Sequence, residues 1–214
     1  MDLSWIINCD VDEFLCTTGA DLQTILAQAD RDGVTLLTVP RRTMTGAPLR
    51  HWERATQSLT LRVDSTLEPT PEQQISWDLP APFVFLDVGG HLAVRASALD
   101  RYGPGAHVAT TTWGRSATSD QLQILHYAIR GFETLLVKVH NTAAWLDDNK
   151  HLGQALCWHW RRWIHLYEQG RLRDEYDQQF MSPARAQTLV QAGICSVDTT
   201  IADWIAKKQG MTAR

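Results

Sequence analysis

The sequence predicts an α/β protein whose last third is helical, and three observations lead to that fold class. Two short apolar runs, at residues 5–7 and 34–39, are rich in residues that favour β-strands. Between them, residues 22–29 carry apolar side chains at helical spacing. From residue 151 onward the spacing of apolar residues is helical again. A strand, a helix and a strand in this order predict a parallel pair joined by a right-handed crossover.

Local signals predict where the first elements begin and end. Asp21 is a suitable helix N-cap and Asp32-Gly33 a suitable helix end, so we expect one helix between them. Pro40 ends the second strand, because proline has no N–H to donate to a sheet. Residues 41–82 contain many turn-forming residues and are predicted to be loop-rich, with a short strand at 60–63.

The middle of the chain is predicted to hold more β-structure. Residues 83–95 are expected to form a hairpin that turns at Val88-Gly89-Gly90. A further strand is expected at 122–127, followed by a helix at 132–140.

The C-terminal third is predicted to be helical, with helices over 151–180 that are separated at Gly170. Further helices are expected at 184–192 and 199–208, the last anchored by Trp204 and Ile205. Trp158, Arg161 and Arg162 fall off the apolar stripe of this region and are available to a partner or an acceptor. The stripe itself, expected to pack in the core, consists of Leu156, Trp160, Trp163, Ile164 and Tyr167.

The composition is that of an ordinary globular protein. The 214 residues carry a formal net charge of −4 without a block of Lys or Arg, so nucleic acid is not an expected partner. No apolar run reaches the length of a transmembrane segment, and the acidic start Met1-Asp2 is not that of a signal peptide. The four cysteines are far apart, without a C-x-x-C pair, and are expected to be reduced thiols in the cytoplasm.

Three acidic residues directly follow the first predicted strand. Asp10 and Asp12 are two positions apart, so in an extended segment their side chains would point the same way and share one cation. Carboxylate oxygens of this kind suit Mg²⁺ or Mn²⁺, which keep coordination positions open for phosphates. The alternative is a polar strand end whose acids are merely solvated.

Two longer segments resemble a known enzyme family. The segment from Ser4 to Leu15, with Asp10-Val11-Asp12-Glu13-Phe14 at its centre, resembles the D-x-D-E-F segment of bacterial family-2-like glycosyltransferases, which are related to the family-92 group. Residues 124–133, together with Lys138, are similar to the H-Y-x-x-R-S-x-E-x-F-x-x-K segment of that family. Residues 39–42 and the turn at 105–107 are similar in place and order, so the resemblance covers roughly residues 4–180.

The resemblance implies a GT-A-like mixed sheet with flanking helices. It implies a catalytic core at 1–145, which would be the rear portion of that fold, and a helical C-terminal extension at 146–214. The family's N-terminal part would then be missing from this chain. The implied activity is transfer of a sugar from a nucleotide-diphosphate sugar donor to a glycan or other hydroxyl acceptor, with Mn²⁺ or Mg²⁺ as the cofactor.

The same resemblance assigns roles to individual residues. Asp10, Asp12 and His126 would bind the metal, and Asp10 could bind the donor's ribose instead. Arg130 and Lys138 would add positive charge against the phosphates. His107 would contact substrate.

No position of the motifs marks the catalytic base that attack by an acceptor hydroxyl requires. Asp120 and Glu53 are the weak candidates.

Two other classes of function stay open. The chain could be a truncated, catalytically inactive glycosyltransferase remnant that serves as a partner subunit. A phosphohydrolase of the haloacid-dehalogenase type also places D-x-D after an apolar strand, but Phe14 stands where that motif has Thr or Val. A calcium loop needs glycine at its sixth position, where this chain has Leu15.

Overall fold

The computed structural model describes residues 4–48, 55–87, 89–103, 107–151, 153 and 156–210. Among them are eight α-helices and strands of both parallel and antiparallel pairing, which confirms the α/β class and the mixed sheet. The chain forms two compact units. Unit 1 contains Met1–Arg42 and Val88–His126, and unit 2 contains Thr43–Asp87 and Tyr127–Arg214. The domain boundary expected after residue 145 falls inside helix α4 (Phe132–Asp148).

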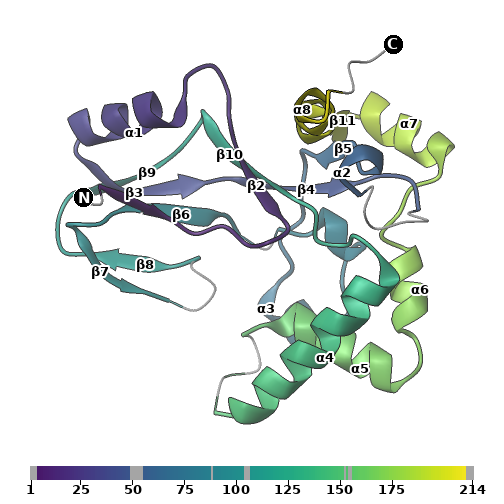
Figure 1. The fold of residues 1–214 in the computed structure, drawn as a ribbon. Helices are drawn as coiled ribbons and strands as arrows, with labels where there is room; N and C mark the ends of the chain where they lie inside the picture. Colours follow the sequence, from purple (N-terminus) through teal and green to yellow (C-terminus); the bar gives the residue numbers. More distant parts are fainter. Residues whose placement is uncertain are drawn as a thin grey trace. The chain divides into compact units, whose positions relative to one another are not determined.

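Unit 1 is built on a four-stranded sheet in the order β1-β6-β3-β9 (Figure 1). Strand β6 is antiparallel to both of its neighbours, and β9 runs parallel to β3. The first two predicted strands, β1 and β3, therefore run parallel to each other as expected, but the expectation that they pair is wrong, since β6 lies between them. The reason is burial, because β6 is buried on both faces whereas β1 is only half-buried and takes an edge. The strands are β1 (Trp5–Ile7), β6 (His91–Arg95), β3 (Val34–Val39) and β9 (Arg115–Thr118).

Helix α1 (Leu22–Arg31) covers one face of this sheet (Figure 1). Its N-terminus is capped as predicted, with the Thr24 backbone N–H donating to Asp21 Oδ1 at 2.8 Å. The core beneath it combines helix and strand residues: Ile25, Ala29, Val34, Leu37, Val39, Ala93, Leu122 and Ile124.

Unit 1 contains a second strand pair, and its first strand begins at the last residue of the acidic segment. Strand β2 (Glu13–Thr17) pairs antiparallel with β10 (Leu122–His126), and Glu13 lies opposite His126 in the register. The strand expected at 122–127 is thus observed, and β2 is a strand that the sequence did not predict. A separate two-stranded sheet joins β7 (Leu99–Tyr102) to β8 (Ala109–Thr111).

In unit 2, β5 (Leu61–Val63) pairs antiparallel with β4 (Arg41–Thr45) through Met44 and Thr45, and with β11 (Cys195–Val197). The hairpin expected over 83–95 is wrong, because Phe83–Phe85 form a 3-10 helix, η2. Its three side chains are all buried, whereas in a hairpin with one solvated face alternate side chains would be exposed. The local core consists of Leu61, Val63, Val84, Phe85, Met181 and Cys195.

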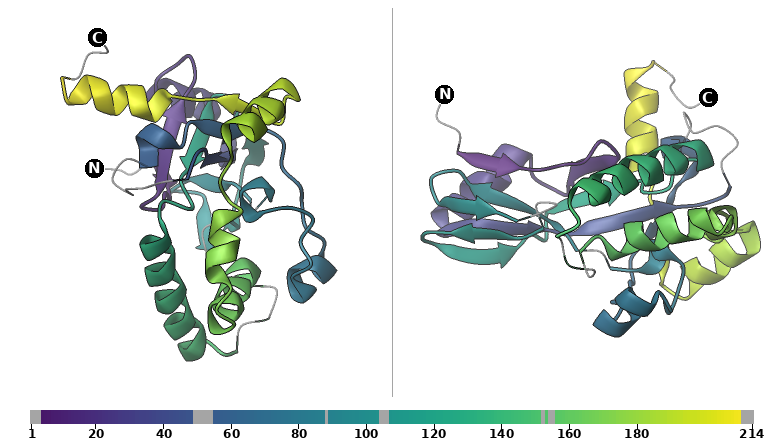
Figure 2. Two further views of the ribbon diagram at one scale, coloured as in Figure 1. Left: turned by 90° about the vertical axis from the view of Figure 1, so that its right-hand side faces the viewer. Right: turned by 90° about the horizontal axis from the view of Figure 1, so that it is seen from below.

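Helices make up most of unit 2. Figure 2 shows α4 and α5 (Trp158–Glu168) side by side. The break at Gly170 is confirmed, with that residue in the left-handed region (φ 70°) between α5 and α6. Ser182 caps α7 by accepting from the Arg185 N–H, as the Ser-Pro signal predicts. The remaining helices are α2 (Ala55–Ser58), α3 (Pro71–Ser76), α6 (Leu172–Asp177), α7 (Pro183–Gln191) and α8 (Thr200–Lys208).

The predicted burial of the C-terminal aromatic residues is only partly correct. Trp163 is buried as expected, but Tyr167 is exposed and the off-stripe Trp158 is buried. The buried residues of helix α5 are Trp158, Trp163 and Leu166, so of the expected stripe only Trp163 is fully buried. Trp204, expected as an anchor, is 55% exposed, and Ile201 is the buried residue of α8.

Two further expectations concern the whole chain. The four cysteines are free thiols. Within the part of the chain that the structure describes, no helix combines the length and apolar character needed to cross a bilayer.

Candidate metal centre

A tight turn connects β1 to β2 and carries the three acidic residues of the sequence motif. The Glu13 backbone N–H donates to the Asp10 carbonyl at 3.0 Å, and the Asp10 N–H donates back to Glu13 Oε2 at 3.0 Å. Val11 lies at the tip and is 90% exposed. The extended geometry expected for Asp10 and Asp12 is therefore wrong. Asp10 takes the first position of the turn, which aspartate favours, and is exposed, whereas Asp12 is buried.

The Glu13 carboxylate is fully buried and is the centre of this site. Its Oε1 accepts from His91 Nε2 at 3.0 Å and from Arg41 Nη1 at 3.4 Å. Burial, the largest single influence, raises the pKa of Glu13. The hydrogen bond from His91, the Asp10 N–H and the charges of His91 and His126 outweigh it and lower that pKa to about 2. Glu13 is therefore a carboxylate at any physiological pH.

His91 is the first residue of β6, and its ring is buried. Its Nδ1 has no hydrogen-bond partner among the described residues. The ring of His107 lies against it, with 4.8 Å between the centroids, and His107 Nδ1 donates to the Gly90 carbonyl at 3.0 Å. Burial lowers the pKa of His107, so this ring is neutral near pH 7 and its Nε2 carries a lone pair.

The preceding residue, Gly90, fixes where β6 begins. A Cβ atom at this position would lie 2.5 Å from the Val39 carbonyl oxygen, so only glycine allows the chain to pass β3 so closely. The close approach places His91 directly beside the Glu13 carboxylate.

Asp10, Glu13 and His91 form a group with the geometry of a metal site. One ligand atom from each residue lies within 4.8 Å of the other two. Ligand atoms around one small divalent ion lie at most about 4 Å apart, since each bond is about 2 Å long. Asp10 is the exposed member of the group, so its side chain is the one with room to adjust. Two carboxylates and an imidazole suit Mn²⁺ better than Mg²⁺.

The predicted metal ligands are distributed over two neighbouring positions. Asp10 belongs to the group just described. Asp12 and His126 lie together, with 3.8 Å between Asp12 Oδ2 and His126 Nε2. His126 lies in this part of unit 1 because β10 places it opposite Glu13.

Sequence reasoning missed Glu13 and His91 as members of the site. Glu13 stands inside the acidic motif, and its position next to a strand was a usable signal. His91 follows two glycines at the head of an apolar run, but it is 78 residues from Glu13. Nothing local predicts that pairing.

The other predicted site residues have different surroundings. Asp120 is exposed and lies beyond Leu122, the far end of β10, which is itself roughly 13 Å from the level of Glu13 at about 3.3 Å per residue, so the structure does not bring Asp120 to the turn. Glu53 lies outside the described residues, as do Gly105 and Ala106. Arg130 and Lys138 belong to unit 2, where Lys138 Nζ lies 5.9 Å from the Trp160 ring centroid.

The fold and the site define an α/β protein with a candidate centre for a divalent metal. No protein-family model matches this chain, and no curated protein matches it.

Proposed function

We propose that this protein is a metal-dependent glycosyltransferase, which moves a sugar from a nucleotide-diphosphate sugar to a hydroxyl acceptor. The observation that carries the proposal is the group formed by Asp10, Glu13 and His91. Asp10 and Glu13 lie in the segment that resembles the D-x-D-E-F motif, directly after β1, and His91 comes from β6.

The charges around the turn support binding of a divalent cation. The turn carries the carboxylates of Asp10, Asp12 and Glu13, and Arg41 pairs with that of Glu13. Carboxylate oxygens that lie this close together are the ligands that hard divalent cations prefer. Asp10 is the exposed member of the group, so it is the residue through which a cation would meet substrate.

Each residue then has a defined role. Glu13 and His91 are held rigidly and would fix the position of the cation, while His107 orients His91 through ring contact. Mn²⁺ or Mg²⁺, when bound, neutralises the negative charge that develops on the departing nucleoside diphosphate. A neutral imidazole at His107 is available to accept a proton or a hydrogen bond.

One observation favours a second candidate function, that of a catalytically inactive partner subunit. The Glu13 carboxylate already has two positive or donating partners in Arg41 and His91. Such a pair also stabilises a turn that never binds metal. The two candidates differ in their response to Mn²⁺ and donor.

The experiment that tests the proposal measures release of nucleoside diphosphate from a panel of UDP-, GDP- and CDP-sugars, with Mn²⁺ or with EDTA. We expect release that requires Mn²⁺ and falls at least about a hundredfold in Asp10→Asn, since loss of one charge-stabilising group costs that much. Asp78→Asn, which changes an exposed aspartate in unit 2, is the matched control and should keep the wild-type rate. Release that is absent with every donor would favour the inactive partner subunit, and release that is equal with Mn²⁺ and with EDTA would contradict the metal dependence.

A further inference from the structure

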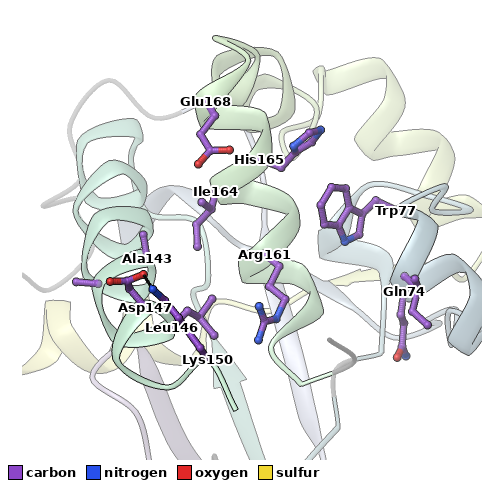
Figure 3. Close-up of a pocket in the computed structure, with 12 residues that line it drawn as sticks. Gln74, Trp77, Ala143, Leu146, Asp147, Lys150, Arg161, Ile164, His165 and Glu168 are labelled. Atoms are coloured by element: carbon purple, nitrogen blue, oxygen red, sulfur yellow. Dashed lines mark ion pairs between the residues drawn. The ribbon is translucent and has the colours of Figure 1, made fainter. Parts of the chain in front are cut away.

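Unit 2 contains a groove that the proposed metal chemistry does not use. It has a volume of about 780 Å³, which is in the usual range of small-ligand sites. Its walls come from α4, α5 and the segment of α3 that ends at Trp77. Figure 3 shows the side chains of α5 in the middle, with those of α4 on one side and Trp77 on the other. All of its lining residues belong to unit 2.

Trp77 gives the groove an aromatic wall. It follows α3 and has φ 62°, in the left-handed region that glycine normally occupies after a helix. A bulky residue is unfavourable in that conformation, so its presence indicates a use for the side chain. Its indole ring lies against His165, with 4.8 Å between the ring centroids, and this contact holds the ring in place. The ring is half-buried, so part of it remains open to a ligand.

The charges along the groove balance one another. Asp147 on α4 and Lys150, just after that helix, form an ion pair with 2.8 Å between Oδ1 and Nζ. Arg161 and Glu168 both line the groove from α5, two helical turns apart. With two carboxylates and two cations, the groove has no net field that would select a strongly charged ligand. A wholly apolar ligand would deprive these charged groups of water without replacing their hydrogen bonds.

We propose that this groove binds a neutral, hydroxyl-rich carbohydrate. A sugar ring has an apolar face of C–H groups that can lie on the indole of Trp77. It also has hydroxyls that both donate and accept hydrogen bonds. Glu168 and Asp147 accept such bonds, and Arg161 and Lys150 donate them. Only a ligand with both properties matches the lining.

In the proposed glycosyltransferase this carbohydrate is the acceptor, and that assignment alone rests on the proposed function. The binding itself depends on neither the metal nor the donor. It can therefore be measured in EDTA, so a failure of the proposed transfer activity and a failure of carbohydrate binding are separate results.

The experiment is a titration of the full chain, in EDTA, with neutral trisaccharides (maltotriose, cellotriose, mannotriose and chitotriose), followed by saturation-transfer NMR and calorimetry. We expect saturable binding of at least one of them at millimolar or lower concentration. Trp77→Gly fits the left-handed backbone, so it removes the ring without adding strain, and we expect it to weaken binding about tenfold. Trp77→Phe, which keeps an aromatic ring, should restore most of the affinity.

Matched controls separate the groove from the rest of unit 2. Trp204→Ala removes an exposed tryptophan of α8 that does not line the groove, and it should leave binding unchanged. Glu168→Gln should weaken binding by a smaller factor than Trp77→Gly does. The proposal is overturned if no neutral trisaccharide binds saturably, or if Trp77→Gly binds the trisaccharide as the wild type does. It is also overturned if UDP binds in EDTA and Trp77→Gly loses that binding.

Discussion

Glu13 carries a negative charge in surroundings that exclude water, and single residues decide whether that charge is tolerated. His91, Arg41 and the Asp10 N–H together supply the stabilisation that solvent would otherwise provide. The sequence predicted that the first strand ends where the acidic segment begins, because acidic residues are unfavourable inside a strand. It did not predict that Glu13 is buried beside His91, since that partner lies in β6.

At this scale we predict that the Glu13 charge stabilises the metal-free protein in a pH-dependent way. Its pKa falls from 4.5 to about 2 on folding, so the contribution is complete above pH 4.5 and is lost as the pH falls toward 2. It amounts to at most about 3 kcal/mol of unfolding free energy. Urea unfolding in EDTA should show Glu13→Gln to be less stable than the wild type at pH 7, with the difference shrinking at pH 3.

The control for this prediction is Glu68→Gln, which changes an exposed glutamate and should alter stability by less than about 0.5 kcal/mol. A difference between Glu13→Gln and the wild type that does not change with pH would show that the charge of Glu13 is not its source.

Among the elements, those with strong local signals were predicted well. Helix α1 lies between Asp21 and Asp32, α7 begins after the Ser182 cap, and β3 ends before Pro40. Elements that depend on distant contacts were not predicted. Strand β6 lies between β1 and β3, and residues 83–85 of the expected hairpin form a 3-10 helix. Both depend on burial against residues that are distant in the sequence.

The position of β6 depends on the close approach of Gly90 to β3. Gly90→Ala would place a methyl group 2.5 Å from the Val39 carbonyl oxygen, so β6 must shift and take His91 with it. We expect a loss of about 1–3 kcal/mol in stability, measured by urea unfolding, and a displaced His91 signal in NMR spectra. Gly153→Ala adds a methyl group that meets nothing within 4 Å, so it should be nearly neutral. Equal stability of Gly90→Ala and the wild type would show that β6 does not need this approach.

At the scale of the whole molecule, the chain passes between the two units after residues 42, 87 and 126. Each unit is therefore assembled from separate segments. Composition and periodicity predicted the α/β class and the helical last third. They could not predict this interleaving, because no local signal records which distant segments share a core. The acidic turn and its partner His91 come from the two different segments of unit 1 for the same reason.

We predict that a fragment of residues 1–145 does not complete both units. The core of unit 2 needs Met181 and Cys195 against Val63 and Phe85, and the fragment lacks the first two. Such a fragment should bind the dye ANS and should unfold with less cooperativity than the full chain, measured by circular dichroism. A compact fragment with one sharp transition and no dye binding would support 1–145 as an independent domain.

Binding of Mn²⁺ to the turn between β1 and β2 is the measurement that tests the central claim most directly. Electron paramagnetic resonance of free Mn²⁺ gives the isotherm for the wild type, for Asp10→Asn and for Asp78→Asn as the control. We expect one ion bound per chain and broadening of the His91 NMR signals by bound Mn²⁺. The affinity for Mn²⁺ should be at least about tenfold lower in Asp10→Asn and unchanged in Asp78→Asn. Equal affinity of Asp10→Asn and the wild type, or His91 signals that Mn²⁺ leaves sharp, would contradict the account.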